Sequence, residues 1–333
     1  MQLKNLKTEF NFNFTELDEI NEYLKKDNLN NDFVSEISDF KEHLDSLKRE
    51  IPVFIPLYEY DEHICTGVNR IIKESKVHEL NREYFIFTNT SKLDSLKQLF
   101  DVKHINIVEV PDSVDSIQKK RVFMFNYAKN KFKNIFQMDA DIFLFCLPVL
   151  AKHNRKKDGS EYIKNDAYPI SCNLVFDIWE YFVQKYDIKH SSLMNNLAFT
   201  FSTKKPFVGK HKYFGMIVHN NIEDAVNRNI EYDIHSGWED IDYVLQYLDK
   251  GIPVHYITMM YKSPQFSCKS AVKKDIKSYY ENNTDTLLNK WKENPNYLSI
   301  KNTNISGTEI KTCIVNFRYF KKKIVQSSIR NNF

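Results

Sequence analysis

Two acidic residues, Asp139 and Asp141, lie one residue apart in the strongly apolar segment 134–145, which reads NIFQMDADIFLF. Burying a carboxylate without a partner is costly, so these acids need a counter-charge. Two carboxylates just past a strand end can both reach one hard cation such as Mg²⁺ or Mn²⁺, which usually binds substrate phosphates as well. The pair therefore predicts metal-assisted chemistry on a phosphate-bearing substrate. The alternative, two ordinary acids in a solvated loop, fits less well because apolar residues follow the pair.

A second acidic motif opens segment 236–251, SGWEDIDYVLQYLDKG, whose apolar residues have helical spacing and which ends at a glycine. Glu239 and Asp240 lie at the predicted start of this helix. Either one could be a general base that takes the proton of an attacking hydroxyl. The competing interpretation is a charge pair that favours a helix N-terminus. Asp242 faces another direction and is expected to be structural.

Two cations, Lys120 and Arg121, lie on the predicted helix 116–132, directly before the acidic strand. Fixed cations at this place could bind a diphosphate. A solvated helix face explains them equally well.

The elements that must position these residues alternate along the chain. Apolar, β-branched runs predict strands, and segments with helical spacing lie between them. Strands are expected at 51–58, 83–90, 104–110 and 134–145, and helices at 63–75, 91–100 and 116–132. This alternation predicts an α/β fold, with a Rossmann-type, mostly parallel central sheet covered by helices on both faces. Ligands bind at the carboxyl ends of such strands. Within 134–145, the run NIFQM ends where Asp139 begins, so Asp139 and Asp141 fall at such an end, and IFLF would be a further short strand or edge segment.

The ends of the first two strands carry further polar groups. Pro56 and Tyr58 follow the first strand, and Thr88 and Asn89 follow the second. We expect these residues near the base and ribose of a nucleotide, although their chemistry is not specific to one.

The remaining segments divide the chain. We expect a helical N-terminal extension over 1–50, a catalytic domain over 51–262 and a helical, basic extension over 263–333. Within the middle part, 151–166 is predicted to be a polar loop and 168–183 mixes helix and strand signals. Further strands are expected at 212–220 and 252–261.

Composition excludes several classes of protein. The net charge of +3 is too small to indicate a partner, and the five cysteines form no C-x-x-C pair. No G-x-G-x-x-G or G-x-x-x-x-G-K pattern is present. No apolar run approaches the ~18 residues of a membrane span, and the first residues do not resemble a signal peptide. We expect a soluble protein in a reducing cytoplasm.

MDADIF after a fourth strand and GWEDID later in the chain resemble the two acidic motifs of D-x-D, GT-A-fold glycosyltransferases. The resemblance covers about residues 51–262. It implies a nucleotide-sugar donor, with a UDP-sugar favoured, and Mn²⁺ or Mg²⁺ at Asp139 and Asp141. It also implies that Asp139 contacts the donor and that Gly237 and Trp238 touch the donor sugar. Such enzymes often have a histidine as a third metal ligand. His255 is the candidate here, although it falls early in its strand.

Two segments, SIQKKRVFMFNYAK and WEDIDYVLQYLDKGIP, also resemble a narrower group, the TET-associated glycosyltransferases of bacteriophages. This resemblance implies a hydroxymethylated pyrimidine in phage DNA as the acceptor, and a host cytoplasm as the location. An acceptor saccharide of a bacterial surface or capsular polysaccharide remains the alternative.

Two other classes compete with this interpretation. A D-x-D phosphatase is disfavoured because its motif belongs on the first strand and is followed by Thr or Val, where this chain has Phe143. A nucleic-acid-binding module could use the basic, aromatic tail 310–333, together with the basic segment 152–157. That class leaves Asp139, Asp141 and the second acidic motif unexplained.

Overall fold

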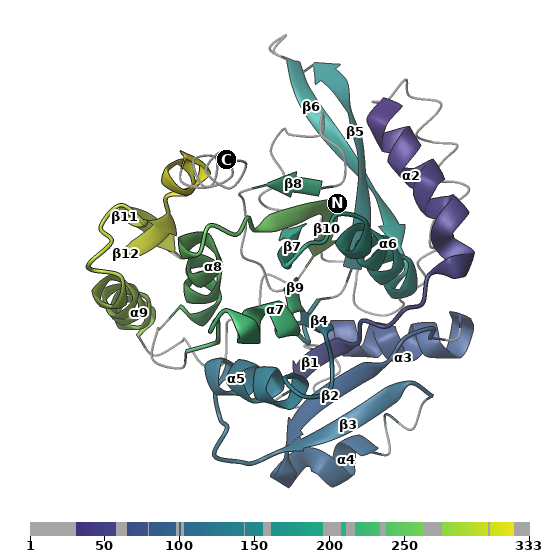
Figure 1. Ribbon diagram of the computed structural model, residues 1–333, viewed down its shortest axis with the longest axis horizontal. Coiled ribbons are helices and arrows are strands. Elements are labelled where there is room, and N and C mark those ends of the chain that lie inside the picture. The colour runs from purple at the N-terminus through teal and green to yellow at the C-terminus, as the bar shows by residue number, and fades with distance from the viewer. Residues whose placement is uncertain are drawn as a thin grey trace.

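The computed structural model of the protein (Figure 1) describes most of the chain after residue 30. The described residues are 31–57, 65–78, 80–97, 100, 103–142, 144–155, 161–195, 208–210, 217–233, 238–262, 275–305 and 307–322. Tyr58, Phe143 and Gly237 lie outside them, as do residues 1–30 and 323–333.

One mixed sheet of ten strands forms the centre of the described part of the chain. Its strands are β1 (Val53–Leu57), β2 (Tyr84–Asn89), β3 (Ile105–Val110), β4 (Asn134–Met138), β5 (Leu144–Arg155), β6 (Glu161–Ile170), β7 (His190–Asn195), β8 (Val208–Lys210), β9 (Ile217–Asn221) and β10 (His255–Lys262). They lie in the order β3-β2-β1-β4-β9-β7-β10-β5-β6, with β8 beside β10. The first four strands of this order are parallel. β9 runs antiparallel to β4 and β7, and β5 and β8 run antiparallel to β10. The predicted mostly parallel α/β sheet is confirmed.

Helices cover both faces of this sheet, as predicted (Figure 1). The helices are α2 (Asn31–His43), α3 (Thr66–His78), α4 (Leu93–Lys97), α5 (Ile117–Ala128), α6 (Cys172–Lys185), α7 (Ile222–Asn227), α8 (Glu239–Asp249) and α9 (Ile276–Lys290), with short 3₁₀ turns at Leu44–Ser46 and Thr90–Lys92. Alternate side chains of each strand point to opposite faces. Phe136 and Met138 of β4 therefore join the core beneath α3 and α6, whereas Ile135 joins the core beneath α5, α7 and α8.

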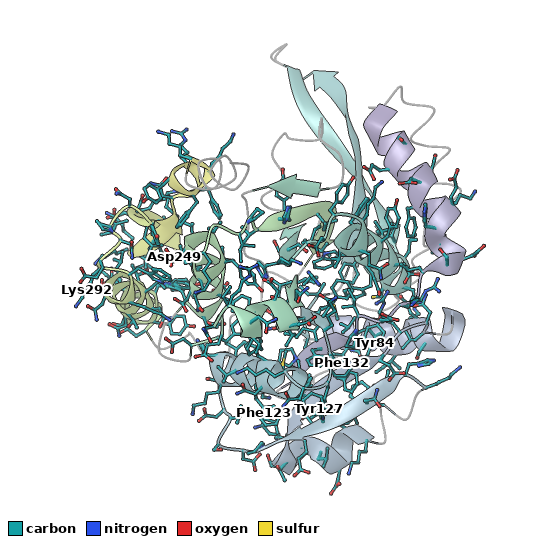
Figure 2. The ribbon with its side chains drawn as sticks, in the orientation of Figure 1. Tyr84, Phe123, Tyr127, Phe132, Asp249 and Lys292 are labelled. Carbon is teal, nitrogen blue, oxygen red and sulfur yellow. The ribbon has the colours of Figure 1, made fainter. Side chains whose placement is uncertain are left out.

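Aromatic rings fill the space between α5 and the first strands. Phe54 of β1 lies 4.9 Å from Phe87 and 5.6 Å from Phe132, measured between ring centroids, and Phe87 lies 5.3 Å from Tyr127. Figure 2 labels Phe123, Tyr127 and Phe132 on this side of the sheet. Tilted and edge-on pairs of this kind stabilise a core beyond their buried area, so they fix α5 firmly on the sheet.

A buried ion cluster fastens the amino-terminal edge of β1 and β2. Arg82, which is fully buried, donates to Asp177 at 2.8 Å and to Glu180 at 2.6 Å, and also to the carbonyl of Ile51 at 2.6 Å. Glu180 in turn accepts the backbone N–H of Glu50 at 2.8 Å. The cluster ties α6 to both strands.

The predicted polar loop at 151–166 is wrong: β5 and β6 form an antiparallel hairpin there. Figure 1 shows that the hairpin extends beyond the helices. Residues 151–166 are mainly polar and show no apolar alternation, which explains why their sequence resembles a loop. The ambiguous segment after it contains the end of β6 and α6, and Ser171 caps α6 by accepting from Leu174 N at 3.1 Å.

The C-terminal part contains a hairpin as well as the expected helix. Strands β11 (Leu298–Ile305) and β12 (Thr308–Val315) pair antiparallel, and they lie with α9 beside α8 (Figure 1). Asp242 of α8 is fully buried and accepts hydrogen bonds from Lys290 and Trp291, each at 2.8 Å. The prediction that Asp242 is structural is confirmed.

Candidate active site

The acidic turn follows β4 directly, at the carboxyl edge of the parallel strands. Asp139 is half-buried and Asp141 is buried, with 8% of its surface exposed. Ile142 N donates to Asp139 O at 3.4 Å and closes the turn. Because β4 is the fourth strand along the chain, the structure gives no support to the phosphatase alternative, which expects its motif on the first.

A glycine that the sequence analysis did not single out supports this turn. Gly67, in the first turn of α3, donates its N–H to Ala140 O at 3.2 Å. A Cβ at this position would lie 2.2 Å from Ile142 O, which is far inside van der Waals contact. Only glycine therefore lets α3 approach the acidic turn this closely. The one signal in the sequence is a glycine at the start of a predicted helix, in a chain with only 7 glycines.

Arg121 connects the acidic turn to the second acidic motif. Ser116 accepts from Lys119 N at 3.2 Å and starts α5, which then carries Arg121 into the protein with 8% of its surface exposed. Its Nη2 donates to Asp139 Oδ1 at 3.3 Å, and its Nη1 donates to Glu239 Oε1. The structure thus brings together three predicted site residues, from the turn after β4, from α5 and from α8. Sequence spacing gave no indication of this link.

The buried charges shift the pKa of the acids. Burial raises the pKa of Asp139 to about 6, Arg121 opposes this shift, and the nearby Asp141 adds to it. Burial also raises the pKa of Glu239, against the attraction of Arg121. A bound cation would relieve the repulsion between the two aspartates, since it favours their charged forms.

The first turn of α8 presents two acids with different surroundings. Glu239 is buried and paired with Arg121, whereas Asp240 is half-buried and accepts from Ile241 N at 2.8 Å. Before them, Trp238 packs 5.2 Å from the ring of Tyr280, and its Nε1 donates to Thr284 Oγ1 at 3.3 Å. Residues of α9 therefore hold Trp238 in place. Of the two candidate bases, Asp240 is more accessible than Glu239.

Lys120 is fully buried beside the end of β1. Its Nζ donates to the carbonyl of Leu57 at 2.7 Å, and burial lowers its pKa to about 8. The structure thus places this cation against the carbonyl group at the end of β1.

The predicted nucleotide-binding residues lie at the ends of β1 and β2. Pro56 and Thr88 are buried, and Thr88 Oγ1 has no hydrogen-bond partner among the described residues. Asn89 donates to the carbonyls of Pro111 and Val114, at 3.2 and 3.1 Å, so its amide holds the neighbouring loop.

The structure does not bring His255 to the acidic turn. The strand register aligns His255 of β10 with Ser191, then with His219, and then with Phe136 of β4. Three strand spacings of about 4.8 Å each separate His255 from β4, so it is about 14 Å away. It is also buried at the start of β10, which is too far to share a ligand with Asp139.

The two aspartates fit a divalent cation that takes its other ligands from substrate or water. Within the described residues, no three His, Cys, Asp or Glu side chains gather so that they could hold a metal ion. Mg²⁺ and Mn²⁺ are commonly bound by one or two carboxylates together with substrate phosphates, and the pair suits this arrangement.

The aromatic residues of the C-terminal segment are packed. Tyr319 and Phe320 lie 5.6 and 4.6 Å from the ring of Tyr297, and Phe320 is fully buried. They are not placed to stack on bases, although Arg318, Lys321 and Lys322 are exposed. Lys323 and Arg330, which also belong to the basic tail, lie outside the described residues.

Comparison with known proteins gives no family. No protein-family model matches the sequence, and no curated protein matches it. Among solved structures, the chain is similar to mannosyl-3-phosphoglycerate synthase from Rubrobacter xylanophilus, with 8% identity, 83% of this chain and 88% of that chain covered, and a TM-score of 0.42.

Two further structures show similarity of the same order. A proposed nucleotide-diphospho-sugar transferase from Desulfovibrio desulfuricans G20 has 10% identity and a TM-score of 0.39, over 73% of this chain and 98% of that one. A mycobacterial protein has 8% identity and a TM-score of 0.40, over 83% and 87%. Similarities this low do not assign the chain to the family of any of them. Among the described helices, none has the length and apolarity needed to cross a membrane.

Proposed function

We propose that this protein is a metal-dependent glycosyltransferase, which moves a sugar from a nucleotide-diphosphate sugar to an acceptor hydroxyl. One observation carries the proposal. Arg121 joins Asp139, at the carboxyl end of β4, to Glu239, in the first turn of α8, so that both acidic motifs meet where α/β sheets bind ligands. If the contact of Arg121 with Glu239 were only structural, it would not explain why two further acids, Asp139 and Asp141, lie at the carboxyl ends of the parallel strands.

In the proposed reaction, the acceptor oxygen attacks the anomeric carbon, and the bond from that carbon to the phosphate oxygen breaks. The nucleotide diphosphate leaves with the electron pair, and Asp240 takes the hydroxyl proton. A divalent cation on Asp139 and Asp141 supplies charge neutralisation for the leaving diphosphate. Glu239, held by Arg121, positions the helix start. If the configuration of the sugar is retained, no base is needed and Asp240 orients the acceptor instead.

The donor and acceptor are also parts of the proposal. A UDP-sugar is the favoured donor, and the acceptor is either a hydroxymethylated pyrimidine in DNA or a saccharide. An odd number of cysteines without a C-x-x-C pair supports action in the cytoplasm, which is the host cytoplasm if a phage encodes the protein.

A panel of nucleotide sugars tests the proposal. With Mn²⁺, we expect turnover of one donor by the wild type, and a loss of at least about 100-fold in Asp141→Asn. Asp115→Asn is the matched control, because Asp115 is exposed and pairs with Lys119 at the start of α5. Hydroxymethylated DNA and oligosaccharides, added separately, identify the acceptor. The proposal fails if no donor turns over and no nucleotide diphosphate binds.

A further inference from the structure

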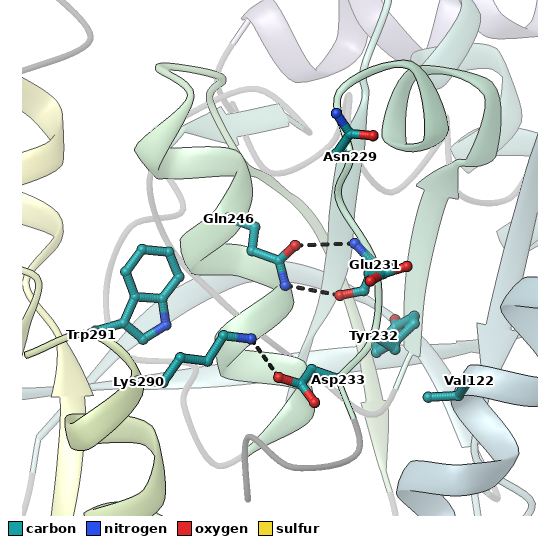
Figure 3. A pocket seen from close by; sticks show the side chains of 8 residues that line it. All are labelled: Val122, Asn229, Glu231, Tyr232, Asp233, Gln246, Lys290 and Trp291. Carbon is teal, nitrogen blue, oxygen red and sulfur yellow. Dashed lines mark hydrogen bonds and ion pairs between the residues drawn. The ribbon is translucent and has the colours of Figure 1, made fainter.

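A hollow of about 390 Å³ lies between α5, α8, α9 and the segment after α7 (Figure 3). Its lining combines two aromatic rings with amides, carboxylates and one lysine. The lining residues are Val122, Asn229, Glu231, Tyr232, Asp233, Gln246, Lys290 and Trp291. A hollow of this volume is within the usual range for small-molecule sites.

The walls of the hollow are held in place by their own hydrogen bonds. Gln246 donates to Glu231 O at 2.8 Å and accepts from Glu231 N at 3.0 Å. Lys290 bridges Asp233 and Asp242, each at 2.8 Å, and Trp291 donates to Asp242. Figure 3 shows Gln246 facing Glu231 and Lys290 facing Asp233. A preformed wall reduces the entropy lost when a ligand binds.

The charge of the hollow selects among ligands. Glu231 and Asp233 line it, and the positive charge of Lys290 is shared between Asp233 and the buried Asp242. The carboxylate of Glu231 remains largely exposed, with its side chain 69% accessible and Lys129 3.9 Å away. An acidic surface of this kind repels phosphates. It favours ligands that donate hydroxyl hydrogens, since O–H to carboxylate hydrogen bonds are strong.

The hollow is separate from the proposed active site, although α5 and α8 contribute residues to both. Val122 follows Arg121 on α5, and Tyr232 lies near Arg121 and Glu239, whose charges act on its pKa in opposite directions. Gln246 comes seven residues after Glu239 on α8, which is about 10 Å along the helix axis. A ligand here cannot present the reacting hydroxyl, but it can belong to the same acceptor molecule.

We propose that this hollow binds an uncharged saccharide unit of the acceptor, further along the chain than the unit that receives the new sugar. The inference rests on the proposed function and chooses a glycan over DNA as its acceptor. Trp291 supplies an apolar surface for the ring, and Glu231 and Asn229 supply hydrogen-bond acceptors at the rim.

Binding measurements on the full chain test the inference. The probes are a panel of labelled neutral trisaccharides, built from glucose, N-acetylglucosamine, galactose or mannose, and a single-stranded oligonucleotide. We expect at least one trisaccharide to bind, and Glu231→Gln to weaken that binding about tenfold. Glu223→Gln is the control, because Glu223 has the same surroundings on α7: its side chain is 61% exposed and lies 3.9 Å from Lys133.

The outcomes separate the inference from the proposed function. If no trisaccharide binds, if Glu231→Gln binds like the wild type, or if the oligonucleotide binds in a way that depends on Glu231, the inference is overturned. Binding of a nucleotide diphosphate with Mn²⁺ is measured on the same samples. Trisaccharide binding without nucleotide binding would support the hollow while contradicting the transferase, and nucleotide binding alone would do the reverse.

Discussion

The molecule contains two clusters that each join one arginine to two acids. They lie at opposite ends of the strands of the same sheet. At the amino-terminal edge, Arg82 holds Asp177 and Glu180. At the carboxyl edge, Arg121 holds Asp139 and Glu239. In both clusters the Nε of the arginine has no partner among the described residues, so the difference between the clusters lies in their acids.

The acids of the Arg82 cluster are supplied with further donors. Asp177 also accepts from Arg49 and Asn81, each at 3.1 Å, and Glu180 accepts two backbone N–H groups. Within the described residues, the carboxylate of Asp139 accepts only from Arg121. A buried carboxylate with several hydrogen-bond donors is satisfied within the fold. A carboxylate with few hydrogen-bond donors can still accept a bound cation. We therefore interpret the Arg82 cluster as structural and propose that a bound ligand completes the Arg121 cluster.

The largest expected effect comes from breaking the Arg82 cluster. Arg82→Met leaves Asp177 and Glu180 buried without their main counter-charge, and we expect the free energy of unfolding to fall by about 3–5 kcal/mol. Urea denaturation measures this change. Arg228→Met is the control, because Arg228, at the C-terminal end of α7, is 44% exposed and pairs with Asp224, so the loss should stay below about 1 kcal/mol. Equal losses in the two variants would contradict a structural role for the Arg82 cluster.

The carboxyl-edge cluster should respond in the opposite sense. Asp139→Asn removes a half-buried charge that has few hydrogen-bond donors, so we expect the free energy of unfolding at neutral pH to be unchanged or to rise by about 1 kcal/mol. Turnover of the nucleotide-sugar substrate should fall by at least about 100-fold. Denaturation and activity assays on one preparation measure both quantities. A stability loss as large as that of Arg82→Met would show that both clusters are structural.

The turn that carries the two aspartates offers a third comparison. Gly67→Ala places a methyl group against the Ile142 carbonyl, so we expect Mn²⁺ affinity to fall about tenfold or more and stability to fall by about 1–3 kcal/mol. Gly307→Ala is the control: its φ of +85° adds strain, but no atom lies within 4 Å of its Cβ position. Mn²⁺ titration monitored by electron paramagnetic resonance compares them. Unchanged affinity in Gly67→Ala would remove the proposed support of the turn.

The smallest expected effect is a pH dependence. The pKa of Asp139 is about 6 in the fold, against an ordinary value of 3.8. The stability that the protonated carboxyl group of Asp139 contributes is therefore fully present below pH 3.8. It is lost as the pH rises through 6. We expect the stability of Asp139→Asn relative to wild type to increase between about pH 4 and pH 7, by on the order of 1 kcal/mol. A difference that does not vary with pH would mean that Asp139 is not held in a donor-poor environment.

The sheet and the place of the acids could be predicted from the sequence because both depend on local patterns. Apolar runs identify β1 to β4, and the end of the NIFQM run identifies the edge where Asp139 emerges. The β5–β6 hairpin could not be predicted in this way, since residues 151–166 lack the apolar alternation that identifies a strand.

The assembly of the site depends on contacts between distant segments. Arg121 and Glu239 are separated by 118 positions, and nothing in either motif specifies that they meet. His255 shows the same limit, because the strand order β4-β9-β7-β10 alone decides its distance from Asp139. The Arg82 cluster likewise joins residues about 95 positions apart, and its acids lie in a segment whose signals were mixed.

The bond from Lys290 to Asp242 has a consequence for the order of events during synthesis. Lys290 follows Asp242 by 48 residues, which a ribosome adds in about 2 to 10 seconds. Until then, the second acidic motif belongs to a helix with an unneutralised acid on its inner side. The helix cannot settle on the sheet at full stability before α9 arrives. The last quarter of the chain therefore controls when the nascent protein becomes competent, although it supplies none of the residues of the candidate active site.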